Sequence, residues 1–564
     1  MGVGKPSELF VRRTSGLVRE MSVSSAVFYN MAAAIGSTLG CGWVYFLSLP
    51  VSEIQIGPWA IQGFEIGVGV GGAFMLLLAY VYMCLVSVMP RTGGDYVFTT
   101  RITSPFLGWL EGWCLLWTVL GFVATTMYLN NWQLNATLTI AAYYLGMPSL
   151  IPASQWWLSN PAIVIMSVIV GVLIFLQALL PAKMYFNSFK WAVLICTVLG
   201  SLSVPLFIGI TPDKALVALQ HFNSMLSSQY AVSADTLNST VTSMGFVNPV
   251  PFSLQTLFFI TGFSMFLYIG FQFSIYFAGE LKGNVTRNVM ISTLAPLAGI
   301  LLLDVFVALP IELSAVGSVG PYANWGWLWW ANEAAVPAGS YPAVQLLAAI
   351  VNPSWAWLAL IASIGVCGLT ITILSSWAAL VSRIVFAWSL DRVIPSWFAA
   401  VNSRTRTPIR LLSLAAVAVV VLTVLAVLGA NPIISAWFTV LMSILTWVMP
   451  GINAMLLPYR RKDLFELAPS WARKKIGGLW VLAVAGAVFL LFIVVSYFYV
   501  FVAPFIAAVS SAGLAGFAGY AIETGIAAFL VTLIIGTIVW FASKWYNAKR
   551  GIRFRDIFTQ LPPQ

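Results

Sequence analysis

Residues 32–50 read AAAIGSTLGCGWVYFLSLP, an apolar membrane segment that Gly36, Gly40 and Gly42 interrupt. Each glycine costs about 1 kcal/mol in a helix interior relative to alanine, so this density of glycines predicts local unwinding. An unwound backbone at membrane depth exposes amide and carbonyl groups, which must line a cavity or face a ligand. The segment is therefore a candidate binding site, although close packing of helices through small residues would use the same glycines.

The whole chain has the composition of an integral membrane protein. Of its 564 residues, 60% are hydrophobic and only 8% are charged, against about 25% charged residues in soluble domains. Apolar stretches of about 20 residues recur along nearly the whole length, which leaves no room for a sizeable soluble catalytic domain. We also expect no cleavable signal peptide, because a polar, basic leader precedes the first span and no small-residue cleavage site follows a short apolar core.

The hydropathy pattern predicts twelve membrane spans. They are expected at residues 24–47, 66–89, 106–130, 161–180, 188–210, 253–279, 290–312, 354–386, 410–429, 432–457, 479–502 and 521–543, each near the length needed to cross a bilayer. The region 131–160 stays open, because LNATLTIAAYYLGM either extends the third span or forms a short outer helix. Two long loops, 211–252 and 313–353, are expected on the outer side. The second contains NWGWLWW, whose tryptophans fit an interfacial belt better than a ligand gate.

The net charge of +10 is sorted by loop. Arginine and lysine precede the first span and cluster after the even-numbered spans, whereas the outer loops contain only Lys214. This asymmetry is the positive-inside pattern, so we expect a multi-pass protein of the cell membrane with both termini in the cytoplasm. The lipid bilayer is thus the expected partner, and nucleic acid is a poor explanation of the charge.

Neither cysteine nor histidine suggests a metal or disulfide framework. The only histidine, His221, is expected in an outer loop. The five cysteines fall within expected spans without paired spacing, which is typical of buried packing residues; they are Cys41, Cys84, Cys114, Cys196 and Cys367. No nucleophile with a base, no metal cluster and no phosphate loop stands out, and PRTGGDY lacks the lysine of a Walker loop. We expect neither an enzyme nor a bound cofactor.

The sixth expected span contains a second break. It continues as FLYIGFQFSIYFAGELKGNVTRN at 266–288, with Gly270 at mid-membrane and polar Gln272 after it. In transporters built from two inverted five-helix repeats, helices one and six correspond, and their broken halves face each other across the substrate. Half-helix N-termini direct partial positive charge at a carboxylate, and freed carbonyls accept hydrogen bonds from an ammonium group. Two breaks at matched positions favour binding over packing.

Four separated motifs resemble the amino acid, polyamine and organocation transporter superfamily. They are G-x-x-x-G-x-G at 36–42, PRTGGDYVF at 90–98, the sixth-span pattern at 268–287, and SRIVFAWSLDRVIPSWFAAVNSRTRTP at 382–408. Their order and spacing are specific, whereas any one of them alone is weak. The resemblance implies an all-α polytopic fold of 12 transmembrane helices, with a 5+5 inverted repeat, broken helices 1 and 6, and helices 11 and 12 outside the repeat.

This fold divides the chain into four parts. They are a cytoplasmic leader at 1–23, a ten-helix transport core at 24–457, helices 11 and 12 with their loop at 458–543, and a cytoplasmic tail at 544–564. We expect a secondary active transporter that moves an amino acid or a related small amine by alternating access, with proton symport as the favoured mode. An amino acid exchanger is one alternative. A non-transporting membrane sensor or assembly subunit on the same fold is an alternative of another class.

The resemblance also implies roles for residues at both breaks. In the first break, backbone and side-chain groups would bind a substrate carboxylate; they are those of Ser37, Thr38, Gly40, Cys41 and Gly42. In the second break, the carbonyls of Phe266 and Ile269, beside Gly270, would accept hydrogen bonds from the substrate amine. Phe266 is either the aromatic gate or an ordinary core aromatic. The mainly small, aromatic and neutral candidates hint at a neutral or aromatic amino acid.

Lys190, in NSFKWAVLICT, resembles a fifth-helix lysine whose ammonium replaces the sodium ion in proton-coupled relatives. A buried ammonium group can load and release a proton during a transport cycle, and Ser375 or Ser376 on the eighth helix would be its partner. Alternatively, Lys190 snorkels to the membrane interface.

Three further polar residues lie within expected spans. Gln272 replaces the acid that many relatives carry after the sixth-helix G-F, which puts a glutamate-based proton step there in doubt. Glu111 and Asp304 are costly in a membrane unless they are paired. Each is a functional candidate or is held by a partner within or between helices.

Overall fold

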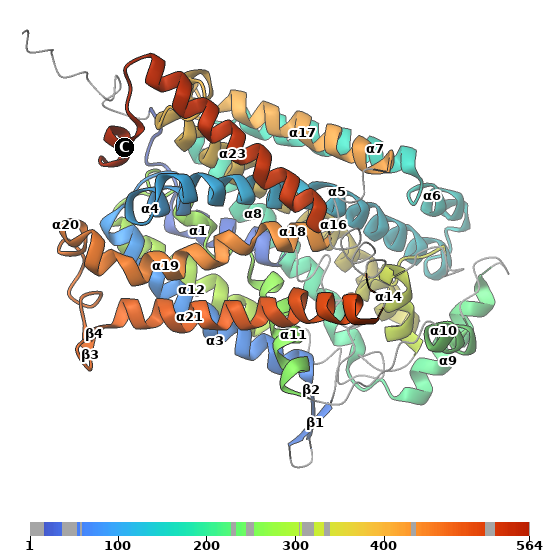
Figure 1. Cartoon of the computed structure of the whole chain (residues 1–564). Helices are drawn as coiled ribbons and strands as arrows, with labels where there is room; N and C mark the ends of the chain where they lie inside the picture. Colours follow the sequence, from blue (N-terminus) through green and yellow to red (C-terminus); the bar gives the residue numbers. More distant parts are fainter. Residues whose placement is uncertain are drawn as a thin grey trace, which may run out of the picture.

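The computed structural model describes residues 16–35, 53–56, 59–226, 233–243, 253–303, 305–306, 321–331, 339–429, 436–511, 513 and 525–562. These residues are mostly helical, and the long helices lie side by side in one bundle (Figure 1). The α-helices are α1 Val23–Ile35, α3 Gly63–Val88, α4 Asp95–Ile102, α5 Pro105–Tyr144, α6 Ile151–Trp156, α7 Asn160–Ala178, α8 Ala182–Gly200, α9 Pro212–Met225, α10 Ala234–Ser243, α11 Leu254–Ser264, α12 Val285–Leu303, α14 Pro321–Ala331, α15 Val344–Val351, α16 Ala356–Leu390, α17 Ile409–Val427, α18 Ala436–Met442, α19 Ile444–Arg460, α20 Lys462–Phe465, α21 Val481–Tyr497, α23 Ile526–Lys549 and α24 Phe554–Phe558.

Short 3-10 segments and two hairpins complete the described structure. The segments that bear on the site are η3 Ser201–Phe207, η5 Met265–Tyr268 and η6 Phe273–Tyr276. The antiparallel strand pairs are β1 Glu53–Ile56 with β2 Trp59–Gln62, and β3 Lys475–Ile476 with β4 Leu479–Trp480.

Ten helices of the described residues are long and apolar enough to cross a membrane. They coincide with the second to fifth and the seventh to twelfth expected spans. Of the two alternatives for the region after residue 130, the structure has the first: α5 continues the third span to Tyr144. At the sixth position, α11 has only 11 residues, which is too short to cross the bilayer alone. At the first position, α1 is described over 13 residues, up to Ile35. Residues 36–52, after α1, lie outside the described residues.

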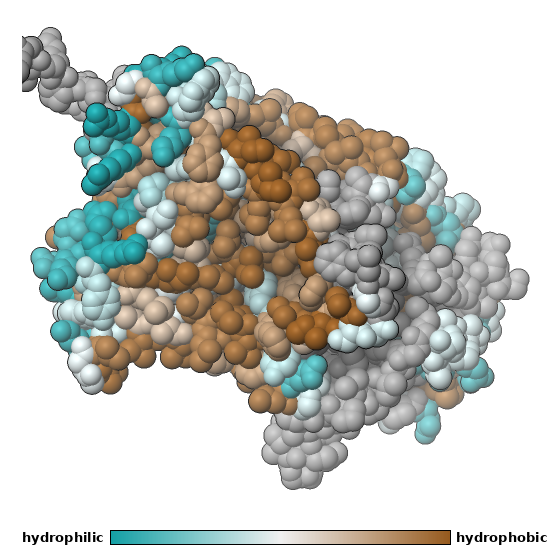
Figure 2. Space-filling model, viewed as in Figure 1, coloured by the Kyte–Doolittle hydropathy of each residue, from teal (hydrophilic) through white to brown (hydrophobic). Residues whose placement is uncertain are grey.

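Many apolar side chains lie on the outer surface of the bundle, as expected for a protein in contact with lipid. Large exposed aliphatic residues line α7, α17, α21 and α23. Figure 2 shows the resulting hydrophobic surface, with hydrophilic residues gathered at the end of the bundle that carries α20 and the C-terminus. We call this end, which includes α4, α20 and α24, the basic end, because it carries the clusters Arg460, Arg461, Lys462 and Arg550, Arg553, Arg555.

Helices α9, α10 and α14 form a cap at the opposite end of the bundle (Figure 1), and α15 belongs to it because it packs against α9. Trp325 and Trp329 of α14 are buried there in an aromatic cluster with Phe222, Trp132 and Tyr341. The prediction of an interfacial tryptophan belt is therefore wrong for these two residues. The reason is that α14 packs against other helices of the cap instead of lying alone at a lipid interface.

The cysteines of the described residues carry free thiols. Cys84 and Cys114 are buried, as predicted, whereas Cys196 and Cys367 are only partly buried. Cys196 fills the narrow gap between α8 and α16, since a Cβ atom added to Gly368 would lie 2.5 Å from its sulfur. Cys41 lies outside the described residues.

Candidate functional site

The sixth span is unwound where the sequence predicts a break. After α11 the chain tightens into η5, turns at residues 269–272 and continues as η6. At the turn Gly270 has φ +101°, a conformation that only glycine adopts without strain. A Cβ atom on Gly270 would also lie 2.3 Å from the Cβ atom of Ala33 in α1. The turn at Gly270 therefore lies in direct contact with α1 at Ala33.

Asn30 of α1 binds the unwound segment to its neighbours. Its side-chain amide donates to the carbonyls of Phe271 (2.6 Å) and Ser292 (2.5 Å), and its oxygen accepts from the backbone N–H of Ser274 at 2.7 Å. Asn30 therefore provides main-chain hydrogen bonds that the unwound helix cannot make within itself.

The predicted residues of the two breaks are described to different extents. Ile269 is buried and Gly270 contacts α1. The side chain of Phe266 lies outside the described residues, as do all five candidates of the first break: Ser37, Thr38, Gly40, Cys41 and Gly42. Asp304 is likewise outside them.

The predicted coupling residues lie on two adjacent helices, α8 and α16. Lys190 is partly buried on α8, and its ammonium nitrogen lies 5.0 Å from the ring centre of Trp191, which is 54% exposed. Ser375 and Ser376 are buried on α16. Within the described residues no hydrogen bond joins Lys190 to either serine, and the Ser376 carbonyl accepts from the Tyr29 hydroxyl of α1 at 2.6 Å.

The double-glycine loop before α4 closes against the exit of the broken helix. The Gly93 amide donates to the Tyr276 carbonyl at 3.1 Å, and Thr92 pairs with Phe277 in a β-bridge. A Cβ atom on Gly94 would lie 2.7 Å from the Tyr276 ring, and one on Gly93 would lie 2.6 Å from the Ala387 Cβ atom. Both glycines are needed because the loop fits between η6 and α16 with no space for side chains.

A buried ion pair joins the same exit segment to α16. Arg383 donates two hydrogen bonds of 2.9 Å to the two oxygens of Glu280, and both side chains are essentially inaccessible. The guanidinium carbon lies 4.7 Å from the ring centre of Phe277. Such a bidentate, fully buried pair specifies one orientation of the two elements.

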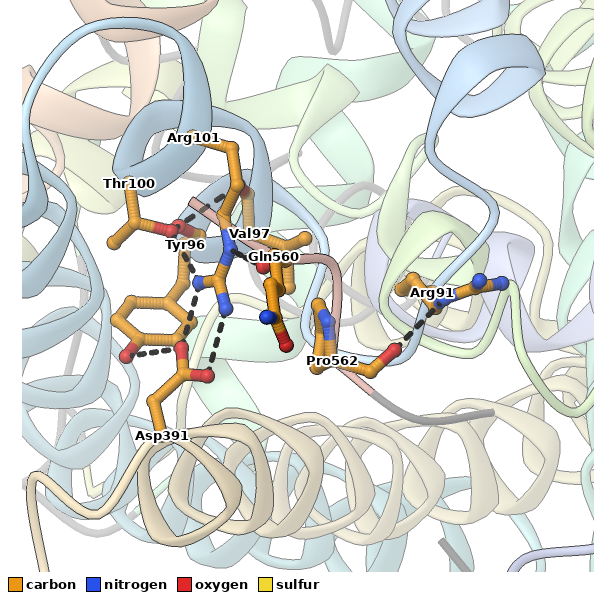
Figure 3. A network of polar contacts seen from close by, with 8 residues as sticks. All are labelled: Arg91, Tyr96, Val97, Thr100, Arg101, Asp391, Gln560 and Pro562. Carbon is orange, nitrogen blue, oxygen red and sulfur yellow. Dashed lines mark hydrogen bonds and ion pairs between the residues drawn. The ribbon is translucent and has the colours of Figure 1, made fainter. Parts of the chain in front are cut away.

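A second buried ion pair joins α4 to the end of α16. Arg101 donates to both oxygens of Asp391, at 2.6 and 2.7 Å, and the Tyr96 hydroxyl donates to the same carboxylate at 2.8 Å (Figure 3). The C-terminal tail lies over this pair: Arg101 Nε donates to the Gln560 carbonyl at 3.3 Å, and Arg91 Nε donates to the Pro562 carbonyl at 2.9 Å (Figure 3). Two buried ion pairs and the tail therefore join α4, α16 and the exit of the broken helix to one another.

Asp95 is a buried carboxyl group that pairs with no cation among the described residues. Asp95, the first residue of α4, accepts from the hydroxyls of Tyr276 (2.5 Å) and Tyr82 (3.2 Å). Burial raises the pKa of Asp95 to about 7, although both tyrosine hydrogen bonds lower it. Asp95 and Gln272 line a small cavity of about 20 Å³ that extends to Ile269 at the break, with room for about one water molecule.

Several of these residues were not singled out from the sequence. Asn30 had a usable signal, because a lone asparagine in an apolar helix needs partners. Arg101, Glu280, Arg383 and Asp391 lie inside or beside the quoted motifs, but their pairing depends on contacts between residues that are more than 100 positions apart.

A family model described as amino acid permease matches residues 28–512. The chain belongs to the amino acid permease family. The permease is therefore a membrane transporter and not an enzyme, and its resemblance to the amino acid, polyamine and organocation superfamily is confirmed.

Two individual similarities are more distant. A stretch of 110 residues is 30% identical to the glutamate/serine transporter AimA of Bacillus subtilis (strain 168), and it covers 19% of the permease and 19% of AimA. The match thus spans about a fifth of that relative's length. A solved structure of a Na⁺-coupled sialic acid symporter, in a substrate-bound outward-open state, is 13% identical over 87% of the permease and 92% of the symporter, with a TM-score of 0.46.

Proposed function

We propose that the permease moves an amino acid or a related small amine across the cell membrane by alternating access, coupled to the proton gradient. The observation that carries this proposal is the unwound segment from η5 to η6, which Asn30 and Gly270 hold against α1. Free main-chain groups at such a break can bind the amino and carboxyl groups that all amino acids share.

In this proposal the two breaks share the recognition of substrate. Ser37, Thr38, Gly40, Cys41 and Gly42 bind the carboxylate, and the carbonyls of Phe266 and Ile269 beside Gly270 bind the amine, with the Phe266 ring as gate. The ten-helix core at 24–457 performs transport, with the helices of 458–543 outside it. Both termini, and with them the basic end, face the cytoplasm, in accordance with the positive-inside pattern.

Lys190 is the proposed proton-coupling residue, with Ser375 or Ser376 as its partner in another state of the transport cycle. Its half-buried position on α8, two turns from the start of the helix, is compatible with a change in exposure when helices move. Lys183 provides a matched control, because it is an exposed lysine near the start of the same helix.

The test is uptake of radiolabelled amino acids by the purified permease in proteoliposomes, with serine, glutamate, leucine and phenylalanine as first candidates. The name of AimA motivates the first two, and the neutral candidate pocket motivates the others. We expect accumulation that an inward proton gradient drives and a protonophore abolishes. Lys190→Ala should lose this accumulation and keep counterflow at equal pH, whereas Lys183→Ala should behave as wild type. Unchanged gradient dependence in Lys190→Ala would refute its coupling role.

The alternatives give different results in the same vesicles. An exchanger would take up substrate only against an internal amino acid, with or without a pH gradient. A sensor or assembly subunit would be stabilised thermally by its ligand and would show no flux.

A further inference from the structure

Two buried carboxyl groups of the permease pair with no cation within the part of the chain that the structure describes. Asp95 is 2% exposed and Glu111, in the second turn of α5, is 0% exposed. Helices α4 and α5 pack against each other. Asp95 and Thr99 lie one turn apart on α4, and Glu111 of α5 interacts with both of them. One oxygen of Asp95 has no hydrogen-bond partner among the described residues. The oxygens of Glu111 make no hydrogen bond of ordinary geometry there, although the Thr99 hydroxyl of α4 acts on this carboxyl group as a donor. Such weakly satisfied buried polar atoms are rare and require an explanation.

The two buried cations of the described residues are already neutralised. Arg101 is bound by Asp391 and Arg383 by Glu280, each with two hydrogen bonds. The titratable groups that act on the pair are Tyr82 of α3, Cys114 of α5 and Tyr276 of η6, and none of them is a cation. Two uncompensated charges inside a membrane protein are costly, and like charges at one site keep a proton on one of them.

The side chain of Gln272 indicates a route for the proton. Gln272 is 7% exposed, its side-chain oxygen has no hydrogen-bond partner among the described residues, and it lines the same cavity as Asp95. This cavity reaches Ile269 at the break of the sixth span. A water molecule there would have polar partners on both sides, as a buried water needs.

We propose that Asp95 and Glu111 form a proton-binding site that couples proton movement to opening of the basic end. The proposal rests on the proposed transport function and adds a second proton carrier to Lys190. A proton from water adds to a carboxylate oxygen of the pair to form a neutral carboxyl group, and it returns to water on the other side; no electrons are transferred. Many relatives carry an acidic residue in the sixth helix where this chain has Gln272. In this proposal the acidic residues Asp95 of α4 and Glu111 of α5 bind the proton instead.

The contacts of Asp95 explain how the proton would act on the structure. The Tyr276 hydroxyl donates to Asp95 at 2.5 Å, and hydrogen bonds to an ionised acceptor are roughly twice as strong as neutral ones. Protonation of Asp95 weakens this bond. The carbonyl of Tyr276 also accepts a hydrogen bond from the Gly93 amide. A proton on Asp95 therefore loosens the contact between the double-glycine loop and the exit of the broken helix. Proton binding therefore favours opening toward the basic end.

The test compares wild type with Asp95→Asn, Glu111→Gln and the double variant in proteoliposomes. Asp463→Asn is the control, because its carboxyl group is exposed and pairs with Arg461 outside the bundle. Each protein is assayed for gradient-driven accumulation, for substrate-dependent proton entry with a trapped pH dye, and for counterflow at equal pH. In Glu111→Gln and the double variant, we expect accumulation and proton entry to be at least about tenfold lower than in wild type. Counterflow should stay within about threefold of the wild-type rate.

An infrared difference spectrum supplies a readout that does not depend on transport. Wild type in detergent at neutral pH should show the C=O band of a protonated carboxyl group, and Glu111→Gln or Asp95→Asn should reduce it, while Asp463→Asn should not. Absence of that band from wild type, or undiminished proton entry in the double variant, would overturn the proposal. Absence of any amino acid flux by wild type would instead refute the proposed function, so the two failures are distinguishable.

Discussion

Gly270→Ala tests whether the contact between the broken sixth span and α1 is as tight as the structure has it. Gly270 has φ +101°, and a side chain held in the positive-φ region costs about 1–2 kcal/mol. The new Cβ atom would lie 2.3 Å from the Ala33 Cβ atom, more than 1 Å inside the usual carbon–carbon contact of about 3.5–4.0 Å. Overpacking of this kind costs about 1–3 kcal/mol. We therefore expect a loss of about 2–5 kcal/mol in the free energy of unfolding.

A second substitution separates the two causes. Ala33→Gly removes the atom that Gly270→Ala would overlap, at a cost of about 1 kcal/mol for a glycine in a helix. The double variant should thus recover the steric part of the loss and keep the backbone strain, with a coupling energy of about 1–3 kcal/mol. Gly69→Ala on α3 is the control, because nothing lies within 4 Å of its added Cβ atom, and it should be neutral or slightly stabilising.

The assay is reversible unfolding in detergent micelles followed by tryptophan fluorescence, with substrate counterflow as the functional readout. Counterflow should fall with the stability loss in Gly270→Ala and rise again in the double variant. Equal unfolding midpoints for wild type and Gly270→Ala would refute the geometry, and additive single effects would refute the contact between Gly270 and Ala33.

Two further predictions concern buried charges. Arg383→Ala leaves Glu280 buried without its cation, so it should cost about 3–5 kcal/mol in unfolding free energy; addition of Glu280→Gln should recover part of this loss, and no recovery would contradict the pairing. The pKa of Asp95 is raised by burial from 3.8 to about 7, so the neutral carboxyl group is favoured in the folded state and its stabilising contribution is lost as pH rises through about 7. Wild type should therefore have a higher thermal midpoint at pH 5.5 than at pH 8, and Asp95→Asn should show a smaller difference; equal slopes would count against the burial of this group.

Hydropathy and glycine placement carried most of the fold prediction. The described spans fall where the apolar segments predict them, because in a bilayer each helix must bury its own backbone and needs about 20 apolar residues to do so. The break at Gly270 follows from the same local rule, since glycine in an apolar helix is costly unless it has a purpose. The end of α5 at Tyr144 was harder to predict, because its polar second half is stabilised by the outer cap and not by lipid.

The candidate site was less accessible to sequence reasoning where it depends on partners. Glu111 was recognised as costly, but the sequence left open whether a partner satisfies it. Asn30 and Asp95 are single polar residues whose roles depend on contacts with elements far along the chain, which the sequence does not show.

The sequence by itself determined that this protein is a polytopic membrane protein, where its spans lie, that the sixth is interrupted at Gly270, and which transporter superfamily its motifs resemble. These properties are local, because they depend on the length, hydrophobicity and glycine content of single segments. Only the tertiary structure decided that Arg101 binds Asp391 and Arg383 binds Glu280, and that Trp325 is buried in the cap. It also decided that Asp95 and Glu111 pair with no cation of the described residues. Pairing and burial are set by which distant segments pack together, and that is a property of the folded bundle alone.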